Sequence, residues 1–197
     1  KHSLIAHEGK LFVFGGLDDQ NHPTNDLWIF SLDKREWEKI VFKDKVPSPR
    51  YDHSAVIYKN VMIVHGGRFN DEKLDDTWFL DLNKMVWSQV KLKKCQNLVP
   101  RCGHVAIVVN QFMLVFGGEG YDNLPFALNI ENLKVLKLKF VGNYIYGMKN
   151  FTAALTSKYK NENEKQIICF GGLNCDDSII INSFTRLYLP NEIVKSD

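Results

Sequence analysis

The sequence predicts an all-β repeat protein built from four-stranded antiparallel units, and three observations support this. The first is a double glycine that follows a short apolar run four times: LFVFGG at 11–16, MIVHGG at 62–67, MLVFGG at 113–118 and IICFGG at 167–172. The spacings between successive pairs are 51, 51 and 54 residues. Self-similarity at a fixed step of this size is typical of repeat architectures. The eight glycines concerned are Gly15, Gly16, Gly66, Gly67, Gly117, Gly118, Gly171 and Gly172.

The second observation is that unrelated residue types keep the same step. His2, His53 and His104 are 51 residues apart, as are Arg50 and Arg101, and the pairs Trp28 to Trp78 and Trp37 to Trp87 are each 50 apart. We therefore place four repeats in one domain over residues 1–197. Their approximate bounds are 1–47, 48–98, 99–148 and 149–197.

The third observation is the strand pattern inside each repeat. Runs of β-branched and aromatic residues alternate with turn-forming clusters every 8 to 12 residues. In the second repeat we expect strands at about 53–58, 61–65, 77–82 and 86–90. The second of these is apolar throughout, which predicts that both its faces are covered by neighbouring layers. The paired glycines would let the chain leave this strand with backbone angles that other residues avoid.

These features resemble the kelch family of β-propellers. The matching segments are the four apolar residues before each Gly-Gly, the aromatic strands DLWIFSLD (26–33) and DTWFLDLN (76–83), and the later Trp37 and Trp87. PSPRYDHSAVIY (47–58) and VPRCGHVAIVV (99–109) look like the P-R-x-x-H-S opening of a variant of that family. The resemblance implies a kelch-type β-propeller of four-stranded antiparallel blades, in which the double glycines and these tryptophans are structural.

The last two repeats depart from the pattern. The third has no Trp in its last strand, where Val135 or Leu136 must serve, and the fourth has Phe151 in place of the recurring histidine. The fourth also extends the turn before its glycines, at 157–165, and shows no evident fourth strand. Because kelch propellers resemble rings of about five to eight blades, we expect about four blades here and an incomplete ring whose open blade ends could support self-association.

Composition excludes several classes of protein. Twenty-five basic residues against 23 acidic ones give a net charge of +2, so no general attraction to nucleic acid or membrane is expected. Four scattered cysteines favour reduced thiols over a disulfide scaffold. No apolar run reaches transmembrane length and the first ten residues lack a signal-peptide core. These features favour the cytoplasm, with the nucleus as the alternative compartment.

No residue pattern points to a catalytic site, a metal or a cofactor. The recurring histidines could ligate a metal, but one per repeat is better explained by hydrogen bonds to the backbone of a neighbouring blade. His65 replaces an aromatic residue, and two interpretations stay open: a local hydrogen-bonded exception or part of a ligand site. Nucleophile-elbow, P-loop and zinc-protease motifs are absent from the sequence, and the double glycines lack the following helix that a phosphate site needs.

The loops are better candidates for a binding surface. In the loops joining the second and third strands of each repeat, acidic residues outnumber basic ones by seven, whereas in the connectors between repeats basic residues outnumber acidic ones by seven. Alternating strand directions place both kinds of loop on one face. Such loops either simply solvate the surface or complement a charged partner. The candidate partner-binding residues are Asp18, Asp19, Arg50, Arg68, Phe69, Asp71, Glu72, Asp75, Arg101, Glu119, Tyr121 and Asp122.

Three functions follow as hypotheses. The leading one is a non-catalytic protein-interaction module that binds a peptide or loop of an unidentified protein partner. The second is the targeting propeller of a larger enzyme, such as a kelch-like Ser/Thr phosphatase or a ubiquitin-ligase adaptor. The third is a lyase- or oxidase-like enzyme that uses the central channel of the propeller.

Overall fold

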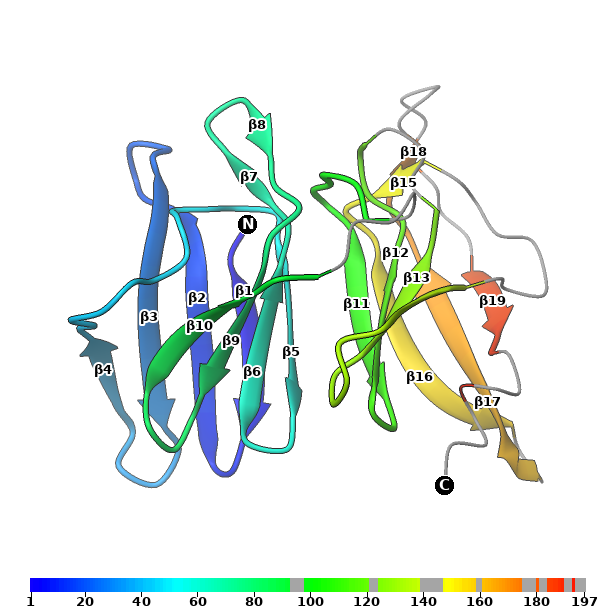
Figure 1. Cartoon of the computed structure of the whole chain (residues 1–197), viewed down its shortest axis with the longest axis horizontal. Helices are drawn as coiled ribbons and strands as arrows, with labels where there is room; N and C mark the ends of the chain where they lie inside the picture. The colour runs from blue at the N-terminus through cyan, green and yellow to red at the C-terminus, as the bar shows by residue number, and fades with distance from the viewer. Residues whose placement is uncertain are drawn as a thin grey trace. The chain divides into compact units, whose positions relative to one another are not determined.

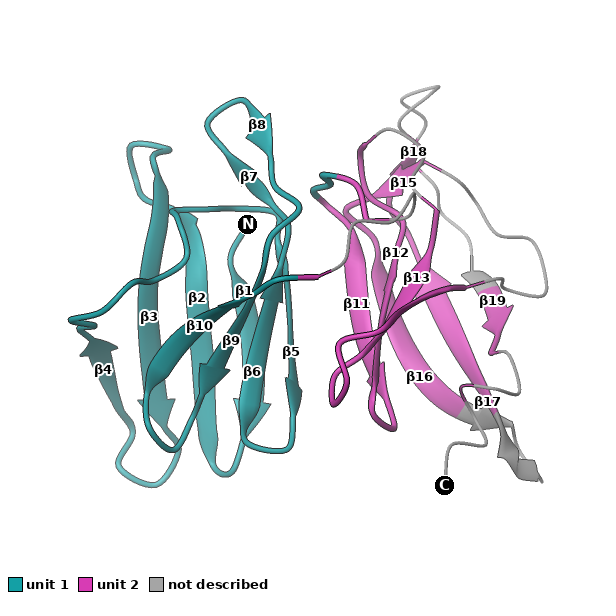
Figure 2. Ribbon diagram, in the orientation of Figure 1, with its two compact units in different colours: residues 1–91, 100–102 teal, residues 92–99, 103–197 magenta. Residues whose placement is uncertain are grey.

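A computed structural model of the chain describes residues 1–92, 98–120, 124–138, 147–158, 161–174, 180, 184–189 and 193. These residues form two compact units, one of residues 1–91 with 100–102, the other of residues 92–99 with 103–197 (Figure 2). Every element of three or more residues in them is a strand (Figure 1). None of the described residues belongs to a helix that is long and apolar enough to span a membrane.

The first unit contains two antiparallel four-stranded blades. The first blade has the order β1 (Ser3–His7), β2 (Lys10–Leu17), β3 (Pro23–Ser31) and β4 (Glu36–Ile40). The second has the order β5 (Ser54–Tyr58), β6 (Val61–His65), β9 (Thr77–Asp81) and β10 (Val86–Val90). A small hairpin of β7 (Arg68–Phe69) and β8 (Glu72–Lys73) lies between β6 and β9 in the sequence. The four strands expected in the second repeat are confirmed to within one residue.

The second unit begins with a four-stranded blade of the same kind. Its first blade consists of β11 (Val105–Val109), β12 (Phe112–Phe116), β13 (Phe126–Asn129) and β14 (Val135–Lys137). In the last repeat the structure describes a sheet of β16 (Thr152–Lys158), β17 (Asn161–Phe170) and β19 (Phe184–Tyr188), and a short pair of β15 (Met148–Lys149) with β18 (Leu173–Asn174). The expectation of a long turn at 157–165 is wrong, because β16 and β17 continue to pair through Lys158 and Asn161, with a bulge after Ser157 that absorbs the extra residues.

The turns are as regular as the strands. In three repeats the third and fourth strands are joined by a tight turn closed by a backbone hydrogen bond, from Arg35 to Ser31, Met85 to Asp81 and Leu133 to Asn129. The last residue of each turn has a positive φ of 53–61°. The side chains of Ser31, Asp81 and Asn129 accept backbone hydrogen bonds inside their own turns, as short polar side chains commonly do.

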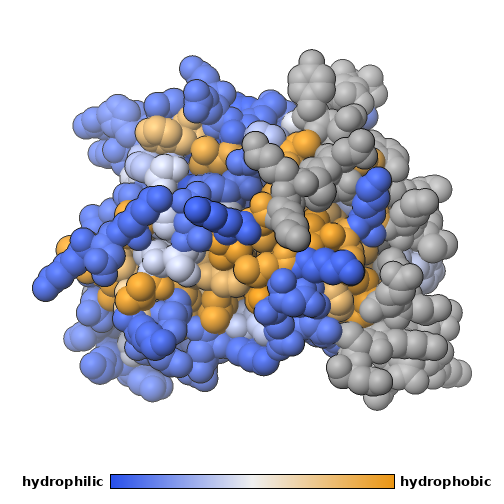
Figure 3. Space-filling view, in the orientation of Figure 1, coloured by the Kyte–Doolittle hydropathy of each residue, from blue (hydrophilic) through white to orange (hydrophobic). Residues whose placement is uncertain are grey.

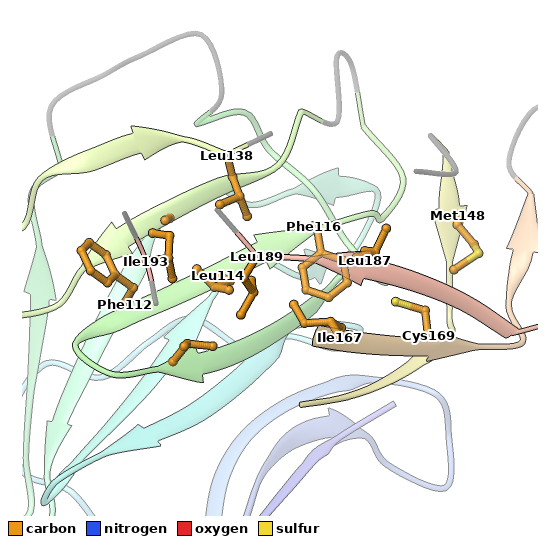
Figure 4. Close-up of a cluster of buried hydrophobic side chains, with 12 residues drawn as sticks. Phe112, Leu114, Phe116, Leu138, Met148, Ile167, Cys169, Leu187, Leu189 and Ile193 are labelled. Carbon is orange, nitrogen blue, oxygen red and sulfur yellow. The ribbon is translucent and has the colours of Figure 1, made fainter. Parts of the chain in front are cut away.

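Each unit has its own core. In the first unit, one face of the first blade, with Phe12, Phe14 and Leu27, packs on a face of the second blade formed by Met62, Val64, Trp78, Leu80 and Trp87. In the second unit, Phe112, Leu114 and Phe116 of β12 gather with Ile167, Cys169 and Leu187 of the last repeat (Figure 4). The strands before the second and third double glycines are buried on both faces, as expected: in β6 only Val61 is not fully buried, and every residue of β12 is buried.

The double glycines and the recurring histidine are explained by one contact. Gly16 and Gly67 have φ values of about 100°, and a Cβ on either would lie within 3 Å of the Cβ of the histidine of its own blade, His2 or His53. The His53 ring also extends to the preceding blade, where it meets the Phe14 ring edge-on at 5.4 Å between centroids. Phe151 takes the same place in the last repeat, because its Cβ lies 2.8 Å from the Cβ position of Gly172. The histidine position is therefore filled for packing.

The tryptophan position differs between the first two blades. Trp87 is buried, with 5% of its surface exposed, and contacts Phe14 across the blade interface. Trp37 occupies the same register position and contacts Phe30, but 52% of it is exposed. In the third repeat the register gives this position to Val135.

Candidate functional site

The β7–β8 hairpin is the most prominent loop of the first unit, and it projects from one end of the second blade (Figure 1). Its base is fixed by backbone hydrogen bonds. Arg68 N–H donates to the Tyr51 carbonyl at 2.8 Å, Tyr51 N–H donates to the Arg68 carbonyl at 3.0 Å, and Arg101 N–H donates to the Leu74 carbonyl at 3.1 Å. A loop held this way loses less conformational freedom on binding than an unpaired loop does.

Three carboxylates occupy this hairpin. Asp71, Glu72 and Asp75 are exposed, and within the described part of the chain none of them forms an ion pair. Phe69 and Arg68 lie half-buried at the base. Residues 68–75 also contain two basic side chains, Arg68 and Lys73, so the net charge of the segment is −1 (three acidic minus two basic residues); for its exposed carboxylates we call it the acidic hairpin. Hydrophilic side chains cover most of this end of the unit in the view of Figure 3.

The loop between β2 and β3 projects from the same end of the unit (Figure 1) and adds two acidic residues, Asp18 and Asp19, both exposed. Asp18 Oδ1 accepts hydrogen bonds from the backbone N–H groups of His22, at 2.7 Å, and Gln20, at 2.9 Å. The hydrogen bond from His22 is the main reason that the pKa of Asp18 is lowered. Asp18 therefore shapes its own loop and stays charged over a wide pH range.

The connector between the two blades contains two basic residues. Lys43 and Lys45 are exposed. Lys45 Nζ lies 5.5 Å from the centre of the Trp78 ring and 3.2 Å from Gln89 Oε1, so the second blade holds it in place. The first unit thus has exposed acidic residues in these two loops and exposed basic residues in the connector, and their grouping on one binding face stays a prediction.

Arg50 requires a correction. The sequence suggested it as a surface anchor, but its side chain is completely buried. Its Nη1 and Nη2 donate to the two carboxylate oxygens of Asp76 at 2.7 and 2.8 Å. The same guanidinium also donates to the Gly66 carbonyl, at 3.0 Å, and to the carbonyl and hydroxyl of Ser48, at 3.1 and 3.0 Å. Arg50 is therefore a structural residue that has no free donor for a partner.

Arg101 is also completely buried, so neither arginine belongs to the candidate surface. Asp76 is not among the residues predicted from the sequence. Burial alone would raise the pKa of Asp76, but hydrogen bonds from Arg50 outweigh this effect and the pKa is lowered. The available signal was the recurrence of D-x-W at Asp26 and Asp76, 50 residues apart, at the step shared by the tryptophans.

The backbone carbonyl at the arginine position accepts a hydrogen bond from the double glycine of the preceding repeat. Gly16 N–H donates to the Arg50 carbonyl at 2.8 Å, and Gly67 N–H donates to the Arg101 carbonyl at 2.9 Å. Gly118 N–H makes the equivalent bond to Met148 at 2.7 Å. The first three double glycines are thereby tied to the opening of the next repeat.

In the second unit, Glu119 lies in the loop after β12 and pairs with Lys149, at 2.6 Å between Nζ and Oε2. An acidic loop residue and a basic connector residue thus neutralise each other there, so Glu119 contributes less to a charged surface than the acidic hairpin does. Tyr121 and Asp122 lie outside the described residues.

The histidines form hydrogen bonds within the protein. His53 Nε2 lies 2.9 Å from the Ser3 hydroxyl of the first blade, so it bonds to the neighbouring blade through a side chain. His65 Nδ1 lies 2.9 Å from Thr77 Oγ1, which supports the hydrogen-bonded interpretation of His65. Burial lowers the pKa of each histidine to about 3, with Arg50 adding to the effect at His53 and Arg101 at His65. Among the described residues, no group of three or more His, Cys, Asp or Glu side chains could hold a metal ion.

Comparison with known proteins gives two family matches. The sequence model of the attractin/LZTR1 β-propeller matches residues 33–192, and that of the kelch motif matches residues 2–41.

Several curated proteins are similar to the chain. Acyl-CoA-binding domain-containing protein 5 of Arabidopsis thaliana is 29% identical over 170 residues, covering 83% of this chain and 26% of that protein. Host cell factor 2 of Homo sapiens is 36% identical over 135 residues, covering 59% of this chain and 17% of that protein. The leucine-zipper-like transcriptional regulator 1 homolog of Drosophila melanogaster is 31% identical over 129 residues, covering 62% and 13%.

The chain thus spans about a quarter or less of the length of these relatives. The family match covers most of the chain, and it agrees with the kelch pattern of the sequence and with the four-stranded blades of the structure. The chain belongs to the attractin/LZTR1 family of kelch-type β-propellers.

Proposed function

We propose that this chain is a protein-interaction module that binds a basic segment of another protein through the acidic hairpin, assisted by the loop that contains Asp18 and Asp19. The observation that carries the proposal is the set of three exposed carboxylates, Asp71, Glu72 and Asp75, on a hairpin whose base is fixed by backbone hydrogen bonds.

Electrostatic and apolar contacts would have different roles at this surface. The carboxylates would attract a lysine- or arginine-containing segment and orient it, which raises the association rate more than the final affinity. Phe69, half-buried at the base of the hairpin, would supply apolar contact, since aromatic residues are enriched among the residues that dominate binding energy. A binding role of this kind requires no catalytic group.

The proposal can be tested without knowing the natural partner. Random linear peptides are displayed and selected on the immobilised 197-residue chain, and the enriched sequences are measured for affinity. We expect enrichment of lysine and arginine, with affinity that falls as salt rises. Selected peptides without basic residues would contradict the proposal.

A matched pair of variants locates the site. Reversing three charges in the hairpin, with Asp71, Glu72 and Asp75 changed to Lys, should weaken binding of a selected peptide by roughly tenfold or more, since exposed ion pairs contribute about 0.2–1 kcal/mol each. The control reverses three exposed acidic residues at the other end of the first blade, Asp33, Glu36 and Glu38, with the same change in net charge. Equal loss in both variants would show that net charge, rather than the hairpin, controls binding.

A second function is favoured by the comparisons. Because the matching region makes up only 13–26% of the relatives cited above, the propeller is one part of larger proteins in those cases. We therefore also propose that this propeller acts as the recognition part of a larger protein in the cytoplasm or nucleus, of the adaptor or enzyme-linked kind. The reading frame on both sides of these residues tests this directly.

A further inference from the structure

A lysine of the chain itself lies on a tyrosine ring beside the acidic hairpin. Lys1 Nζ is 5.0 Å from the centre of the Tyr51 ring and 4.0 Å from Asp52 Oδ2. An ammonium group within about 6 Å of the centre of an aromatic ring is attracted by the negative face of the ring, and the carboxylate adds charge attraction. Tyr51 and Asp52 therefore contact the same chemical group that the proposed basic partner would present.

Tyr51 belongs to the base of the acidic hairpin. Its backbone forms the pair of hydrogen bonds with Arg68 described above. Its hydroxyl donates to the carbonyl of Asn70, at 3.4 Å, in the turn between β7 and β8. The N-terminus, with Lys1, lies at the same end of the first unit as this hairpin (Figure 1). A basic segment bound along the hairpin would therefore reach the Tyr51 ring.

The fold does not require a carboxylate at position 52. Asp52, Gly103 and Asn150 each precede the recurring His or Phe position, and their φ values are 54°, 67° and 56°. Asp52 N–H donates to the Lys1 carbonyl at 3.0 Å, and Asn150 N–H donates to the Gly103 carbonyl at 2.9 Å, which is the same contact between successive repeats. Glycine and asparagine tolerate this backbone conformation as well as aspartate does. The charge of Asp52 is therefore best explained by what its side chain binds.

The side-chain contact of Lys1 is weak enough to be exchanged. The Lys1 side chain is 54% exposed, and its ion pair with Asp52 is long. Exposed ion pairs of this kind contribute little to stability. In contrast, the Asp52 side chain is only 18% exposed, and the backbones of Tyr51 and Asp52 are fixed by hydrogen bonds. A lysine of a bound partner could therefore replace the Lys1 side chain without any rearrangement of the site.

We propose that Tyr51 and Asp52 form a subsite for a lysine side chain of the partner, and that Lys1 occupies this subsite until the partner displaces it. The inference rests on the proposed function and specifies it: one lysine of the basic segment binds the Tyr51 ring and Asp52, while neighbouring basic residues face the acidic hairpin. Lys1 is then an internal competitor that lowers the affinity for the partner.

The competition is tested with a basic peptide selected on the 197-residue chain. Lys1→Met removes the competitor, so the peptide should bind about two- to fivefold more tightly, the range that an exposed contact between an ammonium and an aromatic ring corresponds to. Lys34→Met is the matched control, because Lys34 is an exposed lysine in the turn between β3 and β4 and its loss changes the net charge equally. It should have a smaller effect than Lys1→Met.

The subsite is tested in the K1M background, where Lys1 no longer competes. Asp52→Asn copies Asn150 and so preserves the backbone, and it should weaken peptide binding by about two- to fivefold. Tyr51→Leu should weaken binding to a similar extent, whereas Tyr51→Phe, which keeps the ring, should not. Replacing one lysine of the peptide with norleucine should abolish the effects of both D52N and Y51L. If Y51L fails to fold, as judged by circular dichroism, D52N with the norleucine peptides provides the test.

NMR of the wild-type chain follows the displacement itself. In the unbound chain, the Cε protons of Lys1 should resonate upfield of those of the other lysines because they lie near the Tyr51 ring, and the peptide should move them back. Peptides that bind through the acidic hairpin with equal affinity for K1M and K34M, and for K1M and K1M/D52N, would overturn the subsite while leaving the proposed function intact. Failure of the proposed function is a different result, in which no basic peptide is selected and both proposals are refuted.

Discussion

Replacing Arg50 with methionine would remove a side chain that solvent does not reach and that makes five hydrogen bonds. Asp76 would keep a hydrogen bond from the Trp78 indole at 2.7 Å but would lose its counter-charge. Removing one partner of a buried ion pair costs about 3–5 kcal/mol. Because 21% of the Asp76 side chain is exposed and can gain water, we expect a loss at the lower end, about 3 kcal/mol.

Tryptophan fluorescence during urea unfolding is a suitable assay, because all four tryptophans, at positions 28, 37, 78 and 87, lie in the first unit with Arg50. Arg35, exposed in the turn before β4, provides the control R35M, which should change the free energy of unfolding by less than about 0.5 kcal/mol. The double variant R50M/D76N should be more stable than the sum of the single changes predicts, since it contains no uncompensated carboxylate. A loss below about 1 kcal/mol for R50M would refute the structural role assigned to this arginine.

Three further predictions concern the stability of the first unit. Gly67→Ala should lower the free energy of unfolding by about 3 kcal/mol, because Gly67 has a positive φ and an added Cβ would lie 2.8 Å from the Cβ of His53. Gly9→Ala is the control: its added Cβ would meet no atom within 4 Å, so it should cost only about 1 kcal/mol. Equal losses in chemical denaturation would contradict this packing. Burial lowers the pKa of His53 and of His65 to about 3 in the folded chain, against 6.5 when unfolded. The contribution of these neutral histidines to the free energy of unfolding should therefore be fully present above about pH 6.5. It should fall by about 1.4 kcal/mol per pH unit for each histidine as the pH drops from 6.5 toward 3. His53→Phe, which copies Phe151, should reduce that slope by one proton, and an unchanged slope in pH-dependent urea titrations would show that His53 is not buried in its neutral form. Trp87→Ala should lower the free energy of unfolding by about 3–5 kcal/mol, because Trp87 is buried at the blade interface. Trp37→Ala should lower it by less than about 1 kcal/mol in the monomeric chain, because Trp37 is half exposed. The reverse order would refute the assignment of the blade interface.

The sequence predicts the repeat, the blade strands and the glycine positions well, because these features depend on local backbone rules. A double glycine after an apolar strand predicts a chain that leaves the strand at positive φ, and Gly66 and Gly67 have φ values of 59° and 100°. Strand bounds follow from runs of β-branched residues, which is why β6 and β10 lie where they are expected.

The candidate site was harder to predict because it depends on side-chain direction. Arg50 lies in a polar segment, and its sequence neighbours give no sign that it turns inward to an aspartate 26 residues later. Lys149 and Glu119 are 30 residues apart, so the charges of the two loops do not predict that these two residues form an ion pair. The long turn expected at 157–165 became paired strand, because a polar sequence gives no information on whether a hairpin can continue outside the core.

Amide chemical-shift changes in the 22.8 kDa chain on titration with a selected basic peptide test the proposed binding surface most directly. The account predicts that the largest shifts lie in residues 68–75, with smaller ones in 18–22, and that they disappear when Asp71, Glu72 and Asp75 are changed to Lys. Shifts confined to the opposite end of the blades, around residues 33–38, would contradict it.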